Sequence, residues 1–121
     1  MPNSLKAIGY RAFSQCIRLV NIVLPDSVTS IGNYAFYDCE NLKSISIPAS
    51  VKVIKLEAFA FCSNLETITI PSSVEKIEIS AFLSSYNLKT VNYFGSPSQW
   101  GEIYIDDRNE PLLSAKINYF Y

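Results

Sequence analysis

The sequence predicts an α/β solenoid, a stack of similar coils with a parallel β-sheet along one face and short second strands and short helical turns along the other. Three observations predict this fold: a repeat of fixed period, an alternation of apolar and polar residues before a recurring proline, and a composition typical of a folded protein. The repeat is clearest in an Ala-Phe pair, whose equally spaced phenylalanines are Phe13, Phe36, Phe59 and Phe82. A coil this short cannot bury its apolar side alone, whereas stacked coils bury one another's. We therefore expect these phenylalanines to form a single interior file.

The length and composition fit one folded domain. The chain has 121 residues, of which 49% are hydrophobic. We treat residues 1–121 as a single domain, with repeat coils over 1–91 and a C-terminal capping segment over 92–121. A net charge of -1 argues against nucleic-acid binding, which depends on clustered Lys and Arg. The absence of histidine excludes Ser-His-Asp triads and Cys-His dyads, and no apolar run approaches the roughly 20 residues needed for membrane insertion.

The main strands are predicted by an alternation of period two in each coil. In the segment 44–47, Ile45 and Ile47 alternate with serines, and Pro48 follows. Such alternation is typical of a strand with one buried face, and proline ends the strand because it cannot donate a hydrogen bond to the sheet. We expect five rungs of one parallel sheet, centred on Ile22, Ile45, Ile68, Val91 and, after a slip of a single position, Ala115.

The remainder of each coil is predicted to contain a corner, a second strand and a helical turn. The corner proline is followed by a serine that can bond turn amides, and then by a short β-branched segment such as 51–54, which suits a second strand. Ile31, Ala35 and Cys39 then follow at spacings of four. This spacing favours one or two turns of 3₁₀ or α-helix on the side away from the main strand.

Residues 92–121 depart from the repeat, and we expect them to cap the last coil with bulky aromatic side chains. Ser96, with Pro97 next and Gln99 three residues on, has the pattern of a capping box, so a short helix should begin there. The segment 114–121 alternates like a strand and should close the sheet.

Three cysteines recur at the repeat spacing. Cys16, Cys39 and Cys62 would lie in line on successive coils, whereas zinc ligands must converge tetrahedrally. The expected Cα separation permits a disulfide between neighbouring coils, but parallel Cβ directions would hold the β-carbons too far apart. We therefore predict buried, reduced thiols that fill the core. Ser85 continues this column as a small side chain that can bond a turn carbonyl.

One local acidic cluster is present, formed by Glu102, Asp106, Asp107 and Glu110. Its spacing is not that of an EF-hand and it lacks the central glycine, so we interpret it as a solvated loop in the capping segment. Nothing in the sequence places two carboxylates beside an apolar pocket. We predict no catalytic residue, no cofactor and no metal site, and we do not expect an enzyme.

The repeat unit resembles the BspA-type, or Treponema-type, leucine-rich repeats. Residues 25–47 match the pattern Pro-x-Ser-Val-x-x-Ile-Gly-x-x-Ala-Phe-x-x-Cys-x-x-Leu-x-x-Ile-x-Ile at every fixed position, and residues 93–113 are similar to the segment that closes many such arrays. The resemblance implies a right-handed leucine-rich-repeat solenoid. It also implies adhesion or protein recognition by a secreted or cell-surface bacterial protein. Departures from the pattern are Lys55 and Glu78 in the glycine column and Ser85 in the cysteine column.

The outward positions of the main sheet are the candidate partner-binding residues. They form two rows, Asn21, Ser44, Thr67, Thr90 and Ser114 in the first and Val23, Ser46, Thr69, Asn92 and Lys116 in the second. These rows are short, polar and nearly uncharged, and solenoid sheets generally provide extended concave surfaces for a protein or glycan. Serine and threonine also suit any solvated sheet, so a purely structural interpretation is equally available. We expect no aromatic row on this face, and a sugar-stacking groove is not indicated.

Bulky residues on the opposite side vary between coils, and some should be partly exposed. They are Tyr10, Tyr34, Tyr37, Leu56, Phe61, Ile79 and Leu83. Aromatic residues are enriched at binding hot spots, but for most of this set we favour packing over the turns.

Two functions are compatible with the sequence. The first is a non-enzymatic module that binds host or neighbouring-cell proteins, and the second is a structural spacer and end-cap of a longer array. Residues 2–9 match residues 25–32, so the chain begins in mid-coil, and we expect it to be the C-terminal portion of a longer array. The sequence does not specify an oligomeric state.

Overall fold

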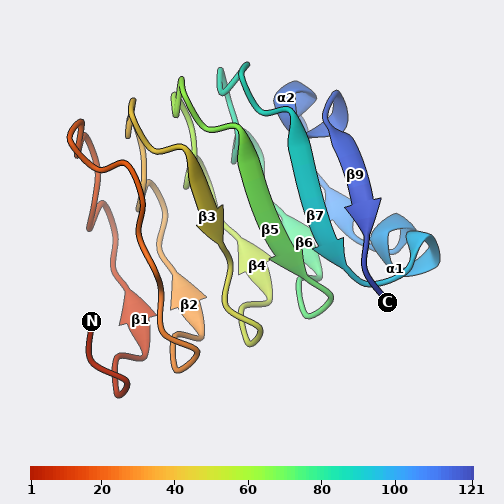
Figure 1. Ribbon diagram of the computed structural model, residues 1–121, viewed down its shortest axis with the longest axis horizontal. Helices are drawn as coiled ribbons and strands as arrows, with labels where there is room; N and C mark the ends of the chain where they lie inside the picture. Colours follow the sequence, from red (N-terminus) through yellow and green to blue (C-terminus); the bar gives the residue numbers. More distant parts are fainter.

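The computed structural model describes residues 1–121 and has the predicted solenoid architecture (Figure 1). The coils lie side by side along the long axis, with the two chain ends at opposite ends of the stack. The elements in chain order are β1 (Ala7–Ile8), β2 (Ser30–Ile31), β3 (Ser44–Ser46), β4 (Val53–Ile54), β5 (Thr67–Pro71), β6 (Lys76–Ile77), β7 (Thr90–Phe94), α1 (Pro97–Gly101), β8 (Tyr104–Ile105), α2 (Glu110–Leu113) and β9 (Lys116–Tyr119).

The main sheet contains four parallel strands in the order β3-β5-β7-β9. Ile45 pairs with Ile68 and Ile68 pairs with Val91, so these coils advance by the period of the repeat, as predicted. The strands β5 and β7 alternate between buried and more exposed residues, because one face of the sheet packs on the core while the other meets solvent.

The last rung of the sheet differs from the prediction. Val91 pairs with Ile117 and not with Ala115, so the step into β9 is longer than the period of the repeat coils. The reason is α2, which occupies the preceding residues. The Ser114 N–H donates to the Glu110 carbonyl at 2.9 Å and so ends this helix, and the strand begins two residues later.

The first rung is only partly formed. The Lys43 N–H donates to the Val20 carbonyl at 2.9 Å, and Asn21 forms an isolated bridge with Ser44. Residues 22–24 make no backbone hydrogen bond. The first coil has a neighbour on one side only, so fewer contacts hold its main segment against β3.

The second strands form two separate parallel sheets, β1-β2 and β4-β6-β8. The corner serines follow the same division. Ser27 donates its hydroxyl to the Leu5 carbonyl of the coil before, and Ser73 donates to the Val51 carbonyl at 2.8 Å. Ser50 makes no such bond, and no strand pairing joins β2 to β4.

The side opposite the main sheet consists of β-turns, so the prediction of helical turns is wrong in the repeat coils. Backbone N–H groups here donate alternately within the coil and to the next coil: Ala35 to Gly32 at 3.2 Å, and Phe36 to Ala58 at 2.9 Å. Residues with positive φ recur in two columns, which hold Arg11, Tyr34, Glu57 and Ser80, and Gln15, Asp38, Phe61 and Ser84. A continuous helix would direct its N–H groups along its own axis, whereas these turns bond each coil to its neighbour.

Gly32 of the glycine column lies where two neighbouring coils approach closely. A β-carbon added to Gly32 would lie 2.7 Å from the backbone nitrogen of Tyr10 in the preceding coil. Glu78, which departs from glycine in the fourth coil, instead accepts the Leu56 N–H on its carboxylate at 3.0 Å. The side chain thus adds a hydrogen bond between coils, since the equivalent N–H groups of Tyr10 and Asn33 donate no backbone bond.

The predicted file of phenylalanines is confirmed. Phe13, Phe36, Phe59 and Phe82 stack with ring centroids 5.2, 5.3 and 5.6 Å apart and interplanar angles of 8°, 3° and 11°. The last three rings are fully buried, and Phe13 in the first coil is partly exposed. The file runs through the core between the main sheet and the turns.

The capping segment covers the last coil. The predicted capping box is present: the Ser96 hydroxyl accepts the Gln99 N–H, and the Gln99 side chain accepts the Ser96 N–H. The buried Tyr93 contacts Trp100 and Tyr119 edge-to-face, with centroids 5.0 and 6.3 Å away. The two helices have five and four residues, and neither could span a membrane.

Candidate binding face of the main sheet

The cysteine side chains belong to the core. Cys39 and Cys62 are buried, Cys16 is half-buried, and all three thiols are free. Cys62 Sγ donates to the Phe36 carbonyl at 3.2 Å, and burial raises the pKa of Cys39 to about 11 and that of Cys62 to about 12. Only the thiolate is a strong nucleophile or metal ligand, so these two thiols are inert at neutral pH.

Ser85 takes the same structural role in the fourth coil. Its hydroxyl donates to the Phe59 carbonyl at 2.6 Å and accepts the Cys62 N–H at 3.0 Å. This agrees with the prediction that the column needs a small side chain able to bond a turn carbonyl.

The acidic residues of the capping segment lie on its surface and bond their own loop. Asp106 accepts the Asp107 N–H on its carboxylate at 2.9 Å, while Glu102 and Glu110 are exposed. No three side chains among His, Cys, Asp and Glu gather closely enough to hold a metal ion. The candidate site is therefore a surface of the solenoid.

The outward face of the main sheet carries the predicted rows, with one correction at their end. The observed rows are Asn21, Ser44, Thr67, Thr90 and Lys116, and Val23, Ser46, Thr69, Asn92 and Asn118. Ser114 ends α2 and lies outside the sheet. Lys116 lies beside Thr90, whereas the prediction placed it beside Asn92. Both shifts follow from the longer step into β9.

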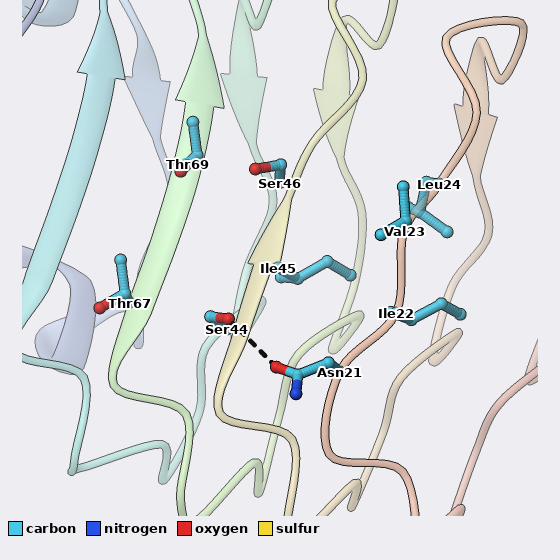
Figure 2. Close-up of a pocket in the computed structure, with 9 residues that line it drawn as sticks. All are labelled: Asn21, Ile22, Val23, Leu24, Ser44, Ile45, Ser46, Thr67 and Thr69. Carbon is cyan, nitrogen blue, oxygen red and sulfur yellow. Dashed lines mark hydrogen bonds between the residues drawn. The ribbon is translucent and has the colours of Figure 1, made fainter.

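A hollow of about 420 Å³ opens on this face next to the first rung (Figure 2). It is lined by Asn21, Ile22, Val23, Leu24, Ser44, Ile45, Ser46, Thr67 and Thr69. The Ser44 hydroxyl lies 3.5 Å from the Asn21 amide oxygen, at one edge of the hollow. Val23 is 86% exposed, so an apolar side chain stands in solvent beside these polar groups.

The polar atoms of the face are largely unpaired. The hydroxyls of Ser46, Thr67, Thr69 and Thr90 make no hydrogen bond within the protein. Lys116 is the one charged residue in either row, and the ion pair of the chain, Lys52 to Glu75 at 3.5 Å, joins residues of the second-strand side. The face therefore offers hydrogen-bonding groups to a partner with little net charge.

An aromatic pair on this face was not predicted. Phe94 continues the outward alternation of β7, and the Phe120 N–H donates to the Tyr93 carbonyl at 2.9 Å, which places Phe120 beside Phe94 on the next rung. Their rings meet edge-to-face with centroids 5.2 Å apart. We expected no aromatic row on this face, and the last two rungs differ from that expectation by this one aromatic pair. The incorrect register of β9 concealed this pair.

The variable residues of the turn side form a second aromatic cluster. Tyr10, Tyr34, Tyr37 and Phe61 contact one another in sequence, each edge-to-face at 5.5–5.8 Å. The Arg11 guanidinium lies 4.9 Å from the Tyr34 ring centroid. Tyr10, Phe61 and Ile79 are exposed, and Tyr34, Tyr37, Leu56 and Leu83 are half-buried. Packing over the turns accounts for most of the set, as expected.

Comparison with known proteins identifies the family. A sequence profile of the BspA type leucine-rich repeat region (6 copies) matches residues 1–107. The chain belongs to this family. No curated protein matches the BspA-type chain.

Two solved structures of bacterial proteins are similar to this BspA-type chain. A leucine-rich cell surface protein of Faecalibacterium prausnitzii A2-165 is 38% identical, with a TM-score of 0.68, and the match covers 86% of this chain and 34% of that one. A leucine-rich repeat protein of T. pallidum is 27% identical, with a TM-score of 0.69, and the match covers 99% of this chain and 60% of that one. The BspA-type chain thus spans about a third and three-fifths of these proteins.

Proposed function

We propose that this chain is a non-enzymatic protein-binding module of a secreted or cell-surface bacterial protein, and that the outward face of its main sheet makes the contact. The observation that carries the proposal is the face itself, which presents unpaired hydroxyl and amide groups, an exposed Val23 and a hollow of about 420 Å³. A buried hydroxyl without a partner would be costly, so these groups need a polar partner wherever a second protein covers them.

The similarity to a protein described as a cell surface protein supports the proposed location. The BspA-type repeats support the proposed role, because a stack of coils builds a continuous surface that no single coil could provide. The thiols of Cys39 and Cys62 are inert at neutral pH, so neither offers an enzyme a nucleophile.

A second candidate function is a spacer and end-cap. The observation that favours it is the aromatic packing of Tyr93 against Trp100 and Tyr119, which covers the last coil. Terminal units of repeat proteins commonly serve this purpose. The two candidates differ in whether the sheet face takes part in adhesion.

Beads coated with the protein test the proposal by their adhesion to bacterial cells and to epithelial cells. We expect the combined substitution Ser44→Arg, Ser46→Arg and Thr69→Arg to reduce adhesion at least about tenfold, because bulky charges would occupy the contact. The matched control is Ser50→Arg with Ser72→Arg, which adds arginine at exposed positions outside the face. Equal adhesion by both variants and the wild type would support the spacer function instead.

A further inference from the structure

The last two rungs of the sheet face differ in chemistry from the rest. Along β3 and β5 the outward side chains are serine and threonine up to Pro71, which pairs with Phe94 at the end of β5. Between β7 and the last rung, three side-chain pairs of different chemistry lie next to one another. Lys116 lies beside Thr90, Asn118 beside Asn92, and Phe120 beside Phe94. A cation, an amide pair and an aromatic pair therefore follow one another along the strand direction.

The aromatic pair is apolar surface that the protein leaves uncovered. Phe94 is 55% exposed and Phe120 is 51% exposed, although the two rings contact each other. Exposed aromatic clusters rimmed by polar groups are typical of protein-interaction sites. Their interplanar angle is 63°, so the rings form a corner and not a flat platform for stacked sugar rings. This geometry suits one apolar side chain set against the corner.

The amide pair next to the rings has free hydrogen-bonding capacity. Asn118 Nδ2 donates to Asn92 Oδ1 at 3.2 Å. This bond leaves the amide nitrogen of Asn92 and the amide oxygen of Asn118 without a side-chain partner. A donor and an acceptor side by side complement the C=O and N–H groups of a peptide backbone.

The cation at the other end is also unpaired. Lys116 is exposed, and no carboxylate lies within ion-pairing distance of it. Lys116 and Phe120 are four residues apart on an extended segment, which corresponds to roughly 13 Å. An extended peptide covers that distance with about five residues.

We propose that β7 and β9 form a docking site for an extended segment of a partner protein, with an acidic side chain at Lys116 and an apolar side chain at Phe94 and Phe120. The segment's backbone bonds Asn92 and Asn118 between these two anchors. This inference rests on the proposed function, because it uses the same face, but it assigns the energetic centre of the face to its C-terminal rungs.

A displayed library of random linear peptides, selected on the immobilised protein, tests the docking site. We expect the selected peptides to share an acidic residue and an apolar residue about four positions apart. Synthetic peptides of that pattern should lose at least about tenfold in affinity for the variant Phe94→Ser with Phe120→Ser. Lys116→Glu should reverse the preference at the acidic position. The matched control, Tyr10→Ser with Tyr86→Ser, removes two exposed aromatic rings elsewhere and should bind as the wild type does.

Other results would overturn the inference. The library could yield no binding peptide, or the selected peptides could bind the Phe94 and Phe120 variant with the same affinity as the wild type. Binding of neutral oligosaccharides by the wild type but not by this variant would also overturn it. The variants alter exposed side chains and, at Thr69, a half-buried one, so unchanged thermal unfolding midpoints verify that they fold. Loss of binding by Ser46→Arg with Thr69→Arg but not by the phenylalanine variant would retain the proposed function and reject the docking site. If neither variant affects binding, both proposals fail.

Discussion

In the second, third and fourth coils the largest fully buried side chain is a phenylalanine that stacks on its counterparts in the neighbouring coils. Phe59 illustrates this residue, since its ring contacts both Phe36 and Phe82 at centroid distances of 5.3 and 5.6 Å. Removing such a ring leaves a cavity that rigid coils on either side cannot fill. The stability of the stack therefore depends strongly on single residues of this file.

Phe59→Ala should lower the free energy of unfolding by about 3–5 kcal/mol, because the substitution combines lost burial with a cavity. Urea denaturation followed by circular dichroism measures this change. Tyr86→Ala, at an exposed aromatic position, is the control and should cost about 0.5 kcal/mol or less. Similar losses for the two variants would contradict an interior phenylalanine file.

The buried thiols predict a loss of stability at alkaline pH. The pKa values of Cys39 and Cys62 in the folded protein, about 11 and about 12, lie above those of unfolded thiols, because burial disfavours the thiolate. A pKa raised by folding contributes stability that is fully present below the unfolded pKa and is lost as pH rises through the folded pKa. Thermal unfolding midpoints, measured under reducing conditions, should therefore fall from about pH 9 toward pH 12.

The variant Cys39→Ser with Cys62→Ser separates the thiols from the tyrosines and lysines that titrate in the same range. Ser85 shows that a hydroxyl can make the same bond to a carbonyl in this column. We expect the variant to show a shallower decline of the unfolding midpoint with pH. A decline as steep as in the wild type would assign the effect to other groups.

At the scale of elements, the capping segment depends on a residue that the sequence did not single out. Asn109 is fully buried at the start of α2. Its Oδ1 accepts the Phe82 N–H at 3.0 Å, and its Nδ2 donates to the carbonyls of Glu78 and Asp106, both at 3.0 Å. The amide oxygen of Asn109 thus replaces the backbone carbonyl that a further coil would offer to the Phe82 N–H.

Asn109→Ala should destabilise the protein by about 2–3 kcal/mol, because it leaves the buried Phe82 N–H and the Asp106 carbonyl without their partners. Asn41→Ala is the control, since Asn41 also bonds a carbonyl of the preceding coil, that of Ile17, but lies exposed to water. Guanidinium denaturation should give a loss of less than about 1 kcal/mol for this control. Equal losses of unfolding free energy in the two variants would mean that the burial of Asn109 does not increase the contribution of its hydrogen bonds to stability.

The elements also show which parts of the structure sequence reasoning reaches. Side chains one repeat apart occupy equivalent positions, so the pairing of the strand centres Ile45, Ile68 and Val91 could be predicted from the repeat spacing alone. The structure of the turn side did not follow from spacing, because apolar residues four positions apart occur both in a helix and in successive β-turns. Hydrogen bonds between coils, such as Phe36 N–H to the Ala58 carbonyl, decide between the two, and they are tertiary.

The candidate site was predictable wherever the repeat continues. Ser46, Thr69 and Asn92 occupy their predicted outward positions. Beyond β7 the spacing is set by α2, whose length no repeat fixes, and a shift of two residues kept the alternation while changing every neighbour. Phe120 consequently reaches Phe94, a contact that depends on this register.

At the scale of the whole molecule, the two ends of the stack are unequal. The capping segment covers the last coil with Tyr93, Trp100 and Tyr119, whereas Phe13 and Ile22 in the first coil are partly exposed and residues 22–24 lack backbone hydrogen bonds. In a solenoid each coil is stabilised by its immediate neighbours. Stability should therefore increase away from the first coil.

Amide hydrogen exchange followed by NMR tests this gradient with two equivalent bonds. The Phe13 N–H donates to the Ala35 carbonyl at 2.7 Å, and the Phe59 N–H donates to the Ala81 carbonyl at 2.8 Å. The amide of Phe13 should exchange at least about tenfold faster, because its coil opens without disturbing a neighbour on the other side. Equal rates would indicate that the stack opens only as a unit.

The central claim is that the outward face of the main sheet binds the partner, and methyl NMR of the protein titrated with an adhesion partner from the bead assay tests it most directly. The methyl groups of Val23, Thr67, Thr69 and Thr90 lie on that face, whereas those of Ile79 and Leu113 are exposed elsewhere. If the face binds the partner, the methyl resonances of the residues on the face change their chemical shifts on titration, and those of Ile79 and Leu113 do not. Shifts confined to Ile79 and Leu113 would contradict it.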